Sequence, residues 1–347
     1  MSYQSDYSGA QVDEAVGKAL NPDAAPTANS TNLVTSGGVA SAVSAVQNTV
    51  SRRNLLDNAY FVGGGSQQGG GQFPINQRGQ TTYSNAGYGI DRWIVNGYGS
   101  LALNTGYISL ETRTMYGGFT QRLEEGAIKD GSKLTLSVLT DTGLYSVTFT
   151  ASKTTPYASD TTWLGVSGLY AYFGWYSSGG AQYWQIYIVD NADGQSHTVN
   201  LFAAKLEIGA DQTLAHQENG VWVLNEIPNF AEELAKCQRY AVAFGSDTYG
   251  VIGCGYSSGS TTVRILVPLP VTMRAVPTFT MISGAIGKMT LRNSSTTYAA
   301  SAISSVDAHG TPSSLELAVV PASTVTAGIP FDCFLKDGAK CLFSADL

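Results

Sequence analysis

Charged residues are what this sequence has least of. Lys, Arg, Asp and Glu make up 13% of its 347 residues, whereas about 25% is ordinary for a globular protein. The 26 acidic residues outnumber the 19 basic ones, and the net charge is −7. A nucleic-acid binder needs a basic surface that neutralises phosphates, and binding to an anionic membrane surface makes the same demand. We therefore expect no nucleic acid and no membrane surface among the partners.

Long hydrophobic runs and metal-binding patterns are also missing. No stretch approaches 18 apolar residues, and the chain opens on polar residues, so we expect synthesis in a cytoplasm, no membrane insertion and no cleaved export signal. The four cysteines lack CxxC spacing and there are only three histidines, which disfavours a zinc site. The glycine runs lack the GxxxxGK[ST] pattern of a phosphate loop. We predict no metal and no cofactor.

From Asn54 onward, short segments of alternating apolar and polar residues are separated by turn residues. Residues 101–103 and 108–110 flank an Asn-Thr-Gly turn, which is the pattern of a β-hairpin, and Asp337-Gly338 predicts another. The strand-helix alternation of a nucleotide-binding sheet is absent. The predicted fold class is mainly β, with two antiparallel β-sandwich or jelly-roll domains, a short N-terminal helical segment and a helical connector.

These patterns divide the chain into four parts. Residues 1–53 are predicted to be an N-terminal helical segment with a short coiled coil, 54–226 a jelly roll, 227–243 a helical connector and 244–347 a second β-sandwich. The connector is read from "NFAEELAKCQRYAV", in which apolar residues recur at helical spacing and two glutamates occupy the first turn, where the helix dipole favours acids.

The N-terminal part contains two helical patterns. Ser8 can cap a helix whose apolar residues recur at i, i+3, i+4 and i+7. Further on, the valines at 39, 43, 46 and 50 (Val39, Val43, Val46, Val50) are spaced 4, 3 and 4 residues apart, the seam of a short coiled coil. Two heptads are too few to hold alone in water. We expect this seam where identical chains meet; the alternative is an amphipathic helix packed on its own chain.

Two arginines and two aspartates lie among glycine turns before residue 93. Arg78 and Arg92 with Asp57 and Asp91 suit bidentate ion pairs that pin a long loop to the sheet. Trp93 beside them is expected to anchor the core, and Asn54, Asn58 and Asn76 to satisfy buried backbone groups. Contact with a ligand is the alternative, but charges this close to glycine turns more often satisfy loops.

Eight aromatic residues crowd into the stretch "GLYAYFGWYSSGGAQYWQIY". Alternation puts Trp184 on one face and Tyr183 on the other, and we expect Trp175, Tyr176 and Tyr183 to point away from the core. Exposed rings stack on the C–H faces of sugars while nearby amides and hydroxyls supply hydrogen bonds. The glycan-binding candidates are Trp175, Tyr176, Tyr183, Tyr170 and Tyr172; packing within the strands or against a subunit is the alternative.

Catalytic patterns are weak. The histidines, His197, His216 and His309, occur without any nucleophile motif and are expected in exposed turns or loops. Glycoside cleavage needs two carboxyl groups about 5–10 Å apart, and Glu124-Glu125 and the acids from Asp190 to Asp193 are the available ones. Such neighbouring acids are commonly solvated, so we predict that the protein is not an enzyme.

Six motifs together resemble a known family. "GAQVDEAVGKALNP", "NLVTSGGV", "NLLDNAYF…PINQRG…GYGIDRW", "AAKLEIG", "ELAKCQRY" and "MRAVPT" are similar to tail fibre or receptor-binding proteins of bacteriophages and prophages of gut bacteria. The resemblance touches most of the chain, and the NQRG–IDRW and ELAKCQRY combination is its most specific part. The chain departs from the family at Ala241, where relatives show Tyr or Phe, and in the length of the glycine-rich run between Tyr60 and Pro74.

The resemblance implies an N-terminal section that attaches to the phage tail or baseplate, a galactose-binding-like or carbohydrate-module-like jelly roll, a C-terminal head domain, and a homotrimer located in the virion tail. We therefore expect a receptor-binding tail fibre protein that recognises a bacterial surface polysaccharide by stacking and hydroxyl hydrogen bonds, multiplied by avidity. Low charge favours a neutral glycan. The alternatives are a tailspike-like glycan depolymerase and a purely structural tail adaptor.

Overall fold

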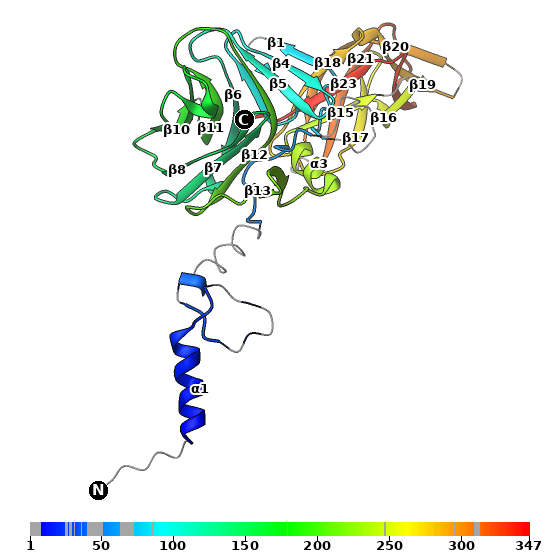
Figure 1. Cartoon of the computed structure of the whole chain (residues 1–347). Helices are drawn as coiled ribbons and strands as arrows, with labels where there is room; N and C mark the ends of the chain where they lie inside the picture. Colours follow the sequence, from blue (N-terminus) through cyan, green and yellow to red (C-terminus); the bar gives the residue numbers. More distant parts are fainter. Residues whose placement is uncertain are drawn as a thin grey trace. The chain divides into compact units, whose positions relative to one another are not determined.

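The computed structural model describes residues 8–24, 27, 30, 32–35, 37–39, 51–62, 73–84, 87–178, 180–245, 248–294, 296–308 and 313–347. They divide into two compact units, one made of residues 1–53 and 211–226 and the other of residues 54–210 and 227–347. Strands dominate both the order of elements and the cores (Figure 1). The predicted mainly-β fold is confirmed.

The first unit contains the predicted N-terminal helix, α1 (Gly9–Leu20). Ser8 caps it: its hydroxyl accepts from the Gln11 backbone N–H, and the Gln11 side chain accepts from the Ser8 N–H, which is a capping box. No residue of α1 is buried. Of the predicted valine seam, Val39 is exposed, whereas Val43, Val46 and Val50 lie outside the described residues, so the seam stays a prediction.

A two-stranded hairpin belongs to the same unit. Its strands are β13 (Ala215–Glu218) and β14 (Val221–Leu224), which pair only with each other. Arg52 connects it to the N-terminal segment, because its N–H donates to Thr213 Oγ1 at 3.0 Å and its side chain contacts Asp211. We expected the jelly roll to extend to residue 226, but these contacts place residues 211–226 with the N-terminal segment instead.

The jelly roll of the second unit consists of two six-stranded antiparallel sheets. The first has the order β1 (Thr82–Ser84), β4 (Ser100–Asn104), β5 (Tyr107–Thr112), β12 (His197–Ile208), β7 (Lys133–Thr140) and β8 (Gly143–Thr150). The second has the order β2 (Gly87–Tyr88), β3 (Trp93–Asn96), β6 (Gly118–Glu124), β11 (Ala181–Asn191), β10 (Leu169–Ser178) and β9 (Tyr157–Ala158). Single-turn 3₁₀ helices follow β6 and β9, at Glu125–Ala127 and Trp163–Gly165.

The core of the jelly roll follows from strand alternation. Leu134, Leu136 and Val138 project inward from β7, and the intervening residues project outward, as a two-residue period requires. Trp93 is fully buried, as predicted; it stacks on Phe119 with ring centroids 4.5 Å apart. The Asn-Thr-Gly turn predicted from the sequence joins β4 to β5.

The C-terminal part of this unit begins with α3 (Phe230–Gln238), the predicted connector, which is capped by Asn229. A three-stranded sheet follows, in the order β15 (Ala241–Gly245), β23 (Lys340–Ser344) and β18 (Thr278–Ser283). The remaining strands form a closed barrel: β16 (Tyr249–Ser257), β17 (Val263–Pro268), β21 (Ser314–Pro321), β20 (Thr296–Asp307), β19 (Met289–Asn293) and β22 (Pro330–Lys336). A 3₁₀ turn, Ile286–Lys288, precedes β19.

Closure of this barrel differs from the open sandwich that we expected for residues 244–347. Gly253 and Gly255 of β16 explain part of the difference: a Cβ at either position would lie 2.0 Å or less from a backbone oxygen of β17. Glycine therefore permits the close approach of the two strands, as at barrel corners. The predicted turn at Asp337-Gly338 is confirmed, because both residues have positive φ and join β22 to β23.

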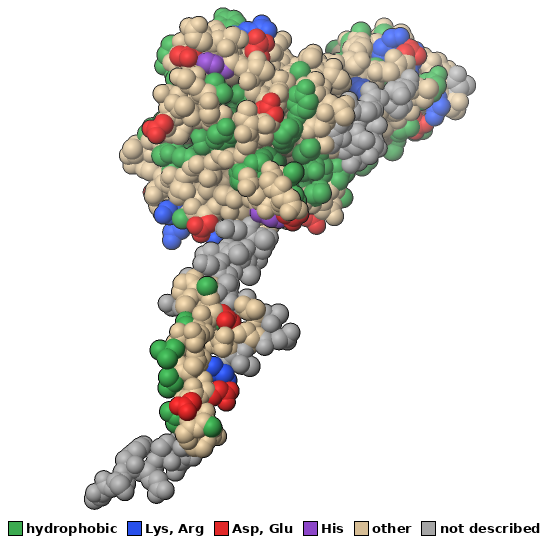
Figure 2. All heavy atoms as spheres, viewed as in Figure 1, with side chains coloured by type: hydrophobic (Ala, Val, Ile, Leu, Met, Phe, Trp, Pro, Cys, Tyr) green, Lys and Arg blue, Asp and Glu red, His purple; other side chains and the backbone are tan. Residues whose placement is uncertain are grey.

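Within the described part of the chain, no helix has the length and apolar character needed to cross a membrane. On the face shown in Figure 2, the side chains of the larger unit are mostly uncharged, with Lys, Arg, Asp and Glu scattered in small groups.

Candidate functional site

A layer of tyrosines covers the outer surface of strands β10 and β11. In this antiparallel pair Tyr172 lies opposite Tyr187, and Tyr176 lies opposite Tyr183. Residues directly opposite each other project to the same face of a sheet. Their neighbours along the strands, Phe173 among them, fill the core, so the four tyrosines face outward. We call these four side chains the tyrosine face.

The rings of the tyrosine face pack against one another. Tyr176 stacks on Tyr183 with centroids 5.8 Å apart, and Tyr172 meets Tyr187 edge to face at 5.9 Å. Burial, together with the nearby Tyr172 hydroxyl, raises the pKa of Tyr176. Gly174 lies between these two residues, and a Cβ there would be 3.1 Å from the Tyr172 ring. Glycine therefore lets the rings close over the strand.

Partial exposure of the tyrosine rings makes this layer a platform. Tyr183 is buried, but Tyr172, Tyr176 and Tyr187 are only half-buried, so each keeps ring surface in contact with solvent. Gln185, between the two tyrosine rows on β11, is buried beneath them. The face is therefore aromatic, with hydroxyls along it.

Polar groups border the platform. The Asn96 amide donates to the Tyr187 hydroxyl at 3.0 Å, and the Arg122 guanidinium lies 4.8 Å from the Tyr183 ring centroid. At the other end the Tyr170 hydroxyl lies near the Asp190 carboxyl, which it faces across the strand pair. Burial raises the pKa of Asp190 to about 6, although the nearby Tyr170 hydroxyl acts in the opposite direction. Burial also raises the pKa of Tyr187 to about 12.

Of the three candidates expected to point away from the core, Tyr176 and Tyr183 face outward and Trp175 does not. Tyr172, Tyr176 and Tyr183 belong to the tyrosine face, and Tyr170 lies at its end. Trp175 does not point away from the core as expected. It lies opposite Trp184 in the hairpin, meets its ring edge to face at 4.9 Å and packs against the hydrophobic core.

Tyr187 is the residue that the sequence reasoning missed. It lies two and four residues after Gln185 and Tyr183, so the alternation already used for Tyr183 puts it on the outer face. The signal was present, but it fell within a segment assigned to the core because of Trp184, Ile186 and Ile188.

The charged residues before Trp93 form a frame next to this sheet. Arg92 Nε contacts Asp57 Oδ2 at 3.1 Å, and Arg78 Nη1 contacts Asp91 Oδ1 at 3.1 Å. The predicted partners are thus confirmed, but neither arginine holds one carboxylate in the bidentate way we expected. Each bridges instead: Arg92 also donates to the Arg122 carbonyl.

The second contact of Arg78 reaches the C-terminal part of the unit. Its Nη2 contacts Asp346 Oδ2 at 2.6 Å. Tyr88 donates to the Leu347 carbonyl at 2.7 Å, and Arg122 donates to the same oxygen. Tyr240, after α3, places its ring 3.4 Å from the Arg92 guanidinium. The outer surface of β2, β3 and β6 is therefore occupied by the protein itself.

Three asparagines complete the frame in the predicted way. The Asn58 amide donates to the carbonyls of Ile75 and Asp91 and accepts from the Ile75 N–H. Asn54 and Asn76 bond backbone groups of neighbouring loops similarly. Buried backbone groups thus find partners, and the constellation is structural.

The carboxyl groups considered for hydrolysis are engaged separately. Glu124 accepts from the Tyr240 hydroxyl at 2.7 Å and from Arg239, while Glu125 contacts Lys153. Asp193 contacts His197 at 2.9 Å. Among the described residues, no group of three or more His, Cys, Asp and Glu side chains is placed to hold a metal ion.

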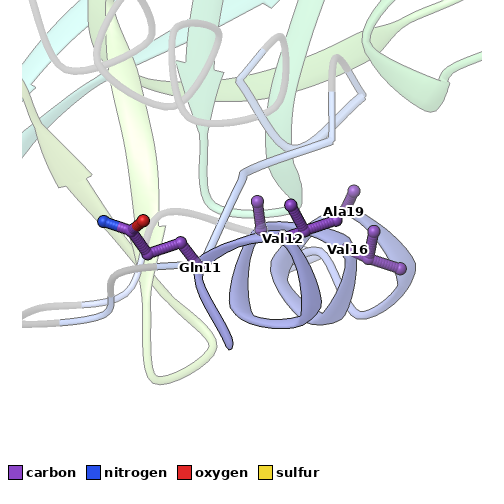
Figure 3. A pocket seen from close by; sticks show the side chains of 5 residues that line it. Gln11, Val12, Val16 and Ala19 are labelled. Carbon is purple, nitrogen blue, oxygen red and sulfur yellow. The ribbon is translucent and has the colours of Figure 1, made fainter. Parts of the chain in front are cut away.

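A second surface feature lies on α1. Gln11, Val12, Ala15, Val16 and Ala19 line a shallow hollow of about 470 Å³ along one side of this helix, and the side chains labelled in Figure 3 all come from α1. Val12 and Val16 are exposed. Glu14 and Lys18 form an ion pair at 2.8 Å elsewhere on the helix.

Comparisons with known proteins do not identify the chain: no protein-family model, no curated protein and no solved structure matches it.

Proposed function

We propose that this protein is a receptor-binding tail fibre protein of a bacteriophage or prophage, and that it binds a bacterial surface glycan through the tyrosine face without cleaving it. The observation that carries the proposal is the platform of Tyr172, Tyr176 and Tyr187, which keeps aromatic surface exposed on one sheet. Aromatic rings bind the apolar faces of sugars, and their hydroxyls supply directional hydrogen bonds.

The charge around the face favours a neutral glycan. Arg122, the cation that borders the tyrosine face, already donates to the Leu347 carbonyl and overlies Tyr183. Asp190, at the opposite end, would repel an anionic sugar once ionised. A phosphate-bearing polymer would call for free Lys or Arg side chains, so a neutral polysaccharide fits better.

Exposed apolar surface elsewhere supports a homotrimer. Tyr249, Val251 and Tyr256 of β16 and Leu266 of β17 are exposed on the outside of the barrel, and β16 pairs with β17. Contiguous exposed apolar side chains of this kind are typical of protein–protein contacts. Three copies would present three tyrosine faces to one cell surface, which multiplies a weak site affinity by about 10²–10⁴.

The unpartnered apolar side of α1 supports attachment to a phage tail or baseplate protein (Figure 2). A 12-residue helix is marginal in water without packing, so a partner that covers Val12 and Val16 would stabilise it. In this proposal the protein acts in the virion tail.

The first test is binding of the fluorescently labelled protein to a panel of gut bacteria, with its mass in solution measured alongside. We expect strain-selective binding by a trimer that is lost after glycan stripping. The double variant Tyr172→Ala/Tyr176→Ala should bind at least about tenfold more weakly, because it removes two of the three exposed rings of the face, and a loss of about 1.4 kcal/mol already weakens binding tenfold. Tyr107→Ala is the matched control, since Tyr107 is a half-buried tyrosine on a strand of the first sheet.

Other outcomes have clear meanings. Equal loss in the control and the double variant would remove the tyrosine face from the proposal. Absence of binding by a folded wild-type trimer would favour a structural tail adaptor, and release of sugar during binding would favour a depolymerase.

A further inference from the structure

Three loops meet at one end of the jelly roll. A Cβ on Gly97, in the turn after β3, would lie 2.8 Å from Gly117 Cα in the loop after β5, and a Cβ on Gly194, in the loop after β11, would lie 3.4 Å from the Met115 side chain. Contacts this close show that the loops are packed together and do not extend separately into solvent.

These loops expose large apolar side chains. Tyr98 is 68% exposed, Tyr116 66% and Met115 50%. We call these three side chains the loop tip. Single exposed apolar residues are ordinary, but here three of them lie on two neighbouring loops of one domain.

The backbone of Tyr116 is strained in a way that holds its ring outward. Its φ is 63°, a left-handed conformation that bulky residues rarely adopt. The conformation is fixed by the hydrogen bond from the Tyr116 N–H to the Asn191 carbonyl at 2.9 Å, and by the bond from the Gly117 N–H to the Thr114 carbonyl. Strain of this kind occurs where surrounding structure imposes it, and it clusters at functional sites.

The loop tip continues the tyrosine face. Asn191, which accepts the Tyr116 N–H, follows Asp190, and Asp190 lies opposite Tyr170 in the β10–β11 pair. The Tyr116 hydroxyl is near enough to that of Tyr170 to contribute to the raised pKa of Tyr170, behind burial and the neighbouring Asp190 carboxyl. Along β11, Tyr183 to Asp190 spans seven residue steps, about 23 Å at roughly 3.3 Å per step. The tyrosine face covers the first four of these steps, as far as Tyr187, and the loop tip lies beyond Asp190.

We propose, on the basis of the function proposed above, that the tyrosine face and the loop tip form one extended site for an internal stretch of a neutral polysaccharide, in which Tyr98 and Tyr116 hold sugars beyond those on the sheet. Gln185 and Gly174, in the middle of the face, are buried, and the exposed rings lie in a row along the strands. A row of rings several times longer than one sugar ring fits a chain lying along the strands.

The test uses polysaccharide fragments of graded length. From a panel of purified neutral capsular and O-antigen polysaccharides, one that binds the wild-type protein is cut by partial acid hydrolysis, and each size fraction is titrated calorimetrically. For the wild type we expect affinity to rise with fragment length and then level off. For Tyr98→Ala/Tyr116→Asn we expect unchanged affinity for the shortest binding fragments and at least a tenfold loss for the longest.

Asn is chosen at position 116 because it tolerates a left-handed backbone while removing the ring. Tyr98→Ala alone is the second variant if the double variant lowers the melting temperature, since the left-handed residue of that turn is Gly97. Tyr107→Ala should match the wild type at every length.

Two results would overturn this inference while leaving the proposed function intact: shortest fragments that bind as tightly as long ones, which would mean recognition of a terminal sugar, or loop-tip variants that match the wild type at every length. A wild-type protein that binds whole cells but no neutral polysaccharide of the panel would overturn the ligand class. A wild-type protein that binds neither cells nor polysaccharide would overturn the proposed function together with this inference.

Discussion

The outer surface of the second jelly-roll sheet has two halves that differ in chemistry. Over β2, β3 and β6, charged side chains such as Arg78 and Arg122 are engaged by Asp346 and Leu347. Over β10 and β11, the surface is tyrosine, and ring surface is still exposed. The first half is an internal interface whose groups are directed at fixed partners. The second half is made of four uncharged tyrosine side chains, three of which keep ring surface in contact with solvent.

The largest expected effect is that of replacing Arg92, which supports the half of the surface over β2, β3 and β6 (the covered half). Its guanidinium is buried, contacts Asp57 and lies over the Tyr240 ring. Arg92→Met leaves Asp57 without its partner, and breaking a buried ion pair costs about 3–5 kcal/mol. We expect that loss in the free energy of unfolding by urea denaturation.

The matched control for this loss is Arg113→Met, which breaks the exposed pair with Glu111. Exposed pairs contribute about 0–1 kcal/mol. Equal losses in the two variants would mean that buried charge does not hold the covered half.

Asp190 allows a test by pH, because it is an ionisable group at the end of the half over β10 and β11. Its pKa is raised from an ordinary 3.8 to about 6, chiefly by burial, so the folded protein binds this proton more tightly than the unfolded chain does. The stabilisation is complete below about pH 4 and is lost as the pH rises through 6. Asp190→Asn should remove this dependence.

The measurement for Asp190 is urea denaturation at pH 4, 5, 6 and 7 with the wild type and Asp190→Asn. Between pH 4 and pH 7 the wild type should lose on the order of 2 kcal/mol relative to the variant. Parallel pH profiles for the two proteins would mean that Asp190 titrates normally and that the end of the face is well solvated.

The smallest effect on stability is expected for a substitution in the half over β10 and β11. Tyr176→Ala removes a stack on Tyr183 and one hydroxyl contact, which together contribute about 1 kcal/mol. Thermal denaturation should show a small fall in melting temperature, similar to that of Tyr107→Ala. A fall as large as that of Arg92→Met would make the tyrosine face part of the structural frame.

Much of the fold could be predicted from the sequence because local rules determine it. The turn residues at 104–106 and at Asp337-Gly338 select tight hairpins, and a two-residue period sets which side chains enter the core. Ser8 caps α1 as predicted, and the predicted connector helix is found as α3. Closure of the barrel was not predictable in this way, because it depends on which strands pair across long separations.

The candidate site likewise combines features that local rules determine with contacts between residues distant in sequence. Tyr176 and Tyr183 could be placed by alternation, and the same two-residue period puts Trp175, the neighbour of Tyr176 on β10, on the core side opposite Trp184. The partners of the frame in the C-terminal part, Asp346 and Tyr240, are remote in sequence from Arg78 and Arg92. No local sequence pattern predicts a contact between two residues that are 268 positions apart, as Arg78 and Asp346 are.

The contacts of Arg78 and Arg122 with Asp346 and Leu347 can form only late in synthesis of the chain. The jelly-roll strands are complete at residue 208, and domains generally fold as units while the chain is still being made. The groups that cover β2, β3 and β6 are translated more than a hundred residues later. A nascent chain that has not reached Asp346 therefore lacks the second contact of Arg78 and the Leu347 partner of Arg122, whereas Arg78 already has Asp91 and Arg92 already has Asp57 within the jelly roll.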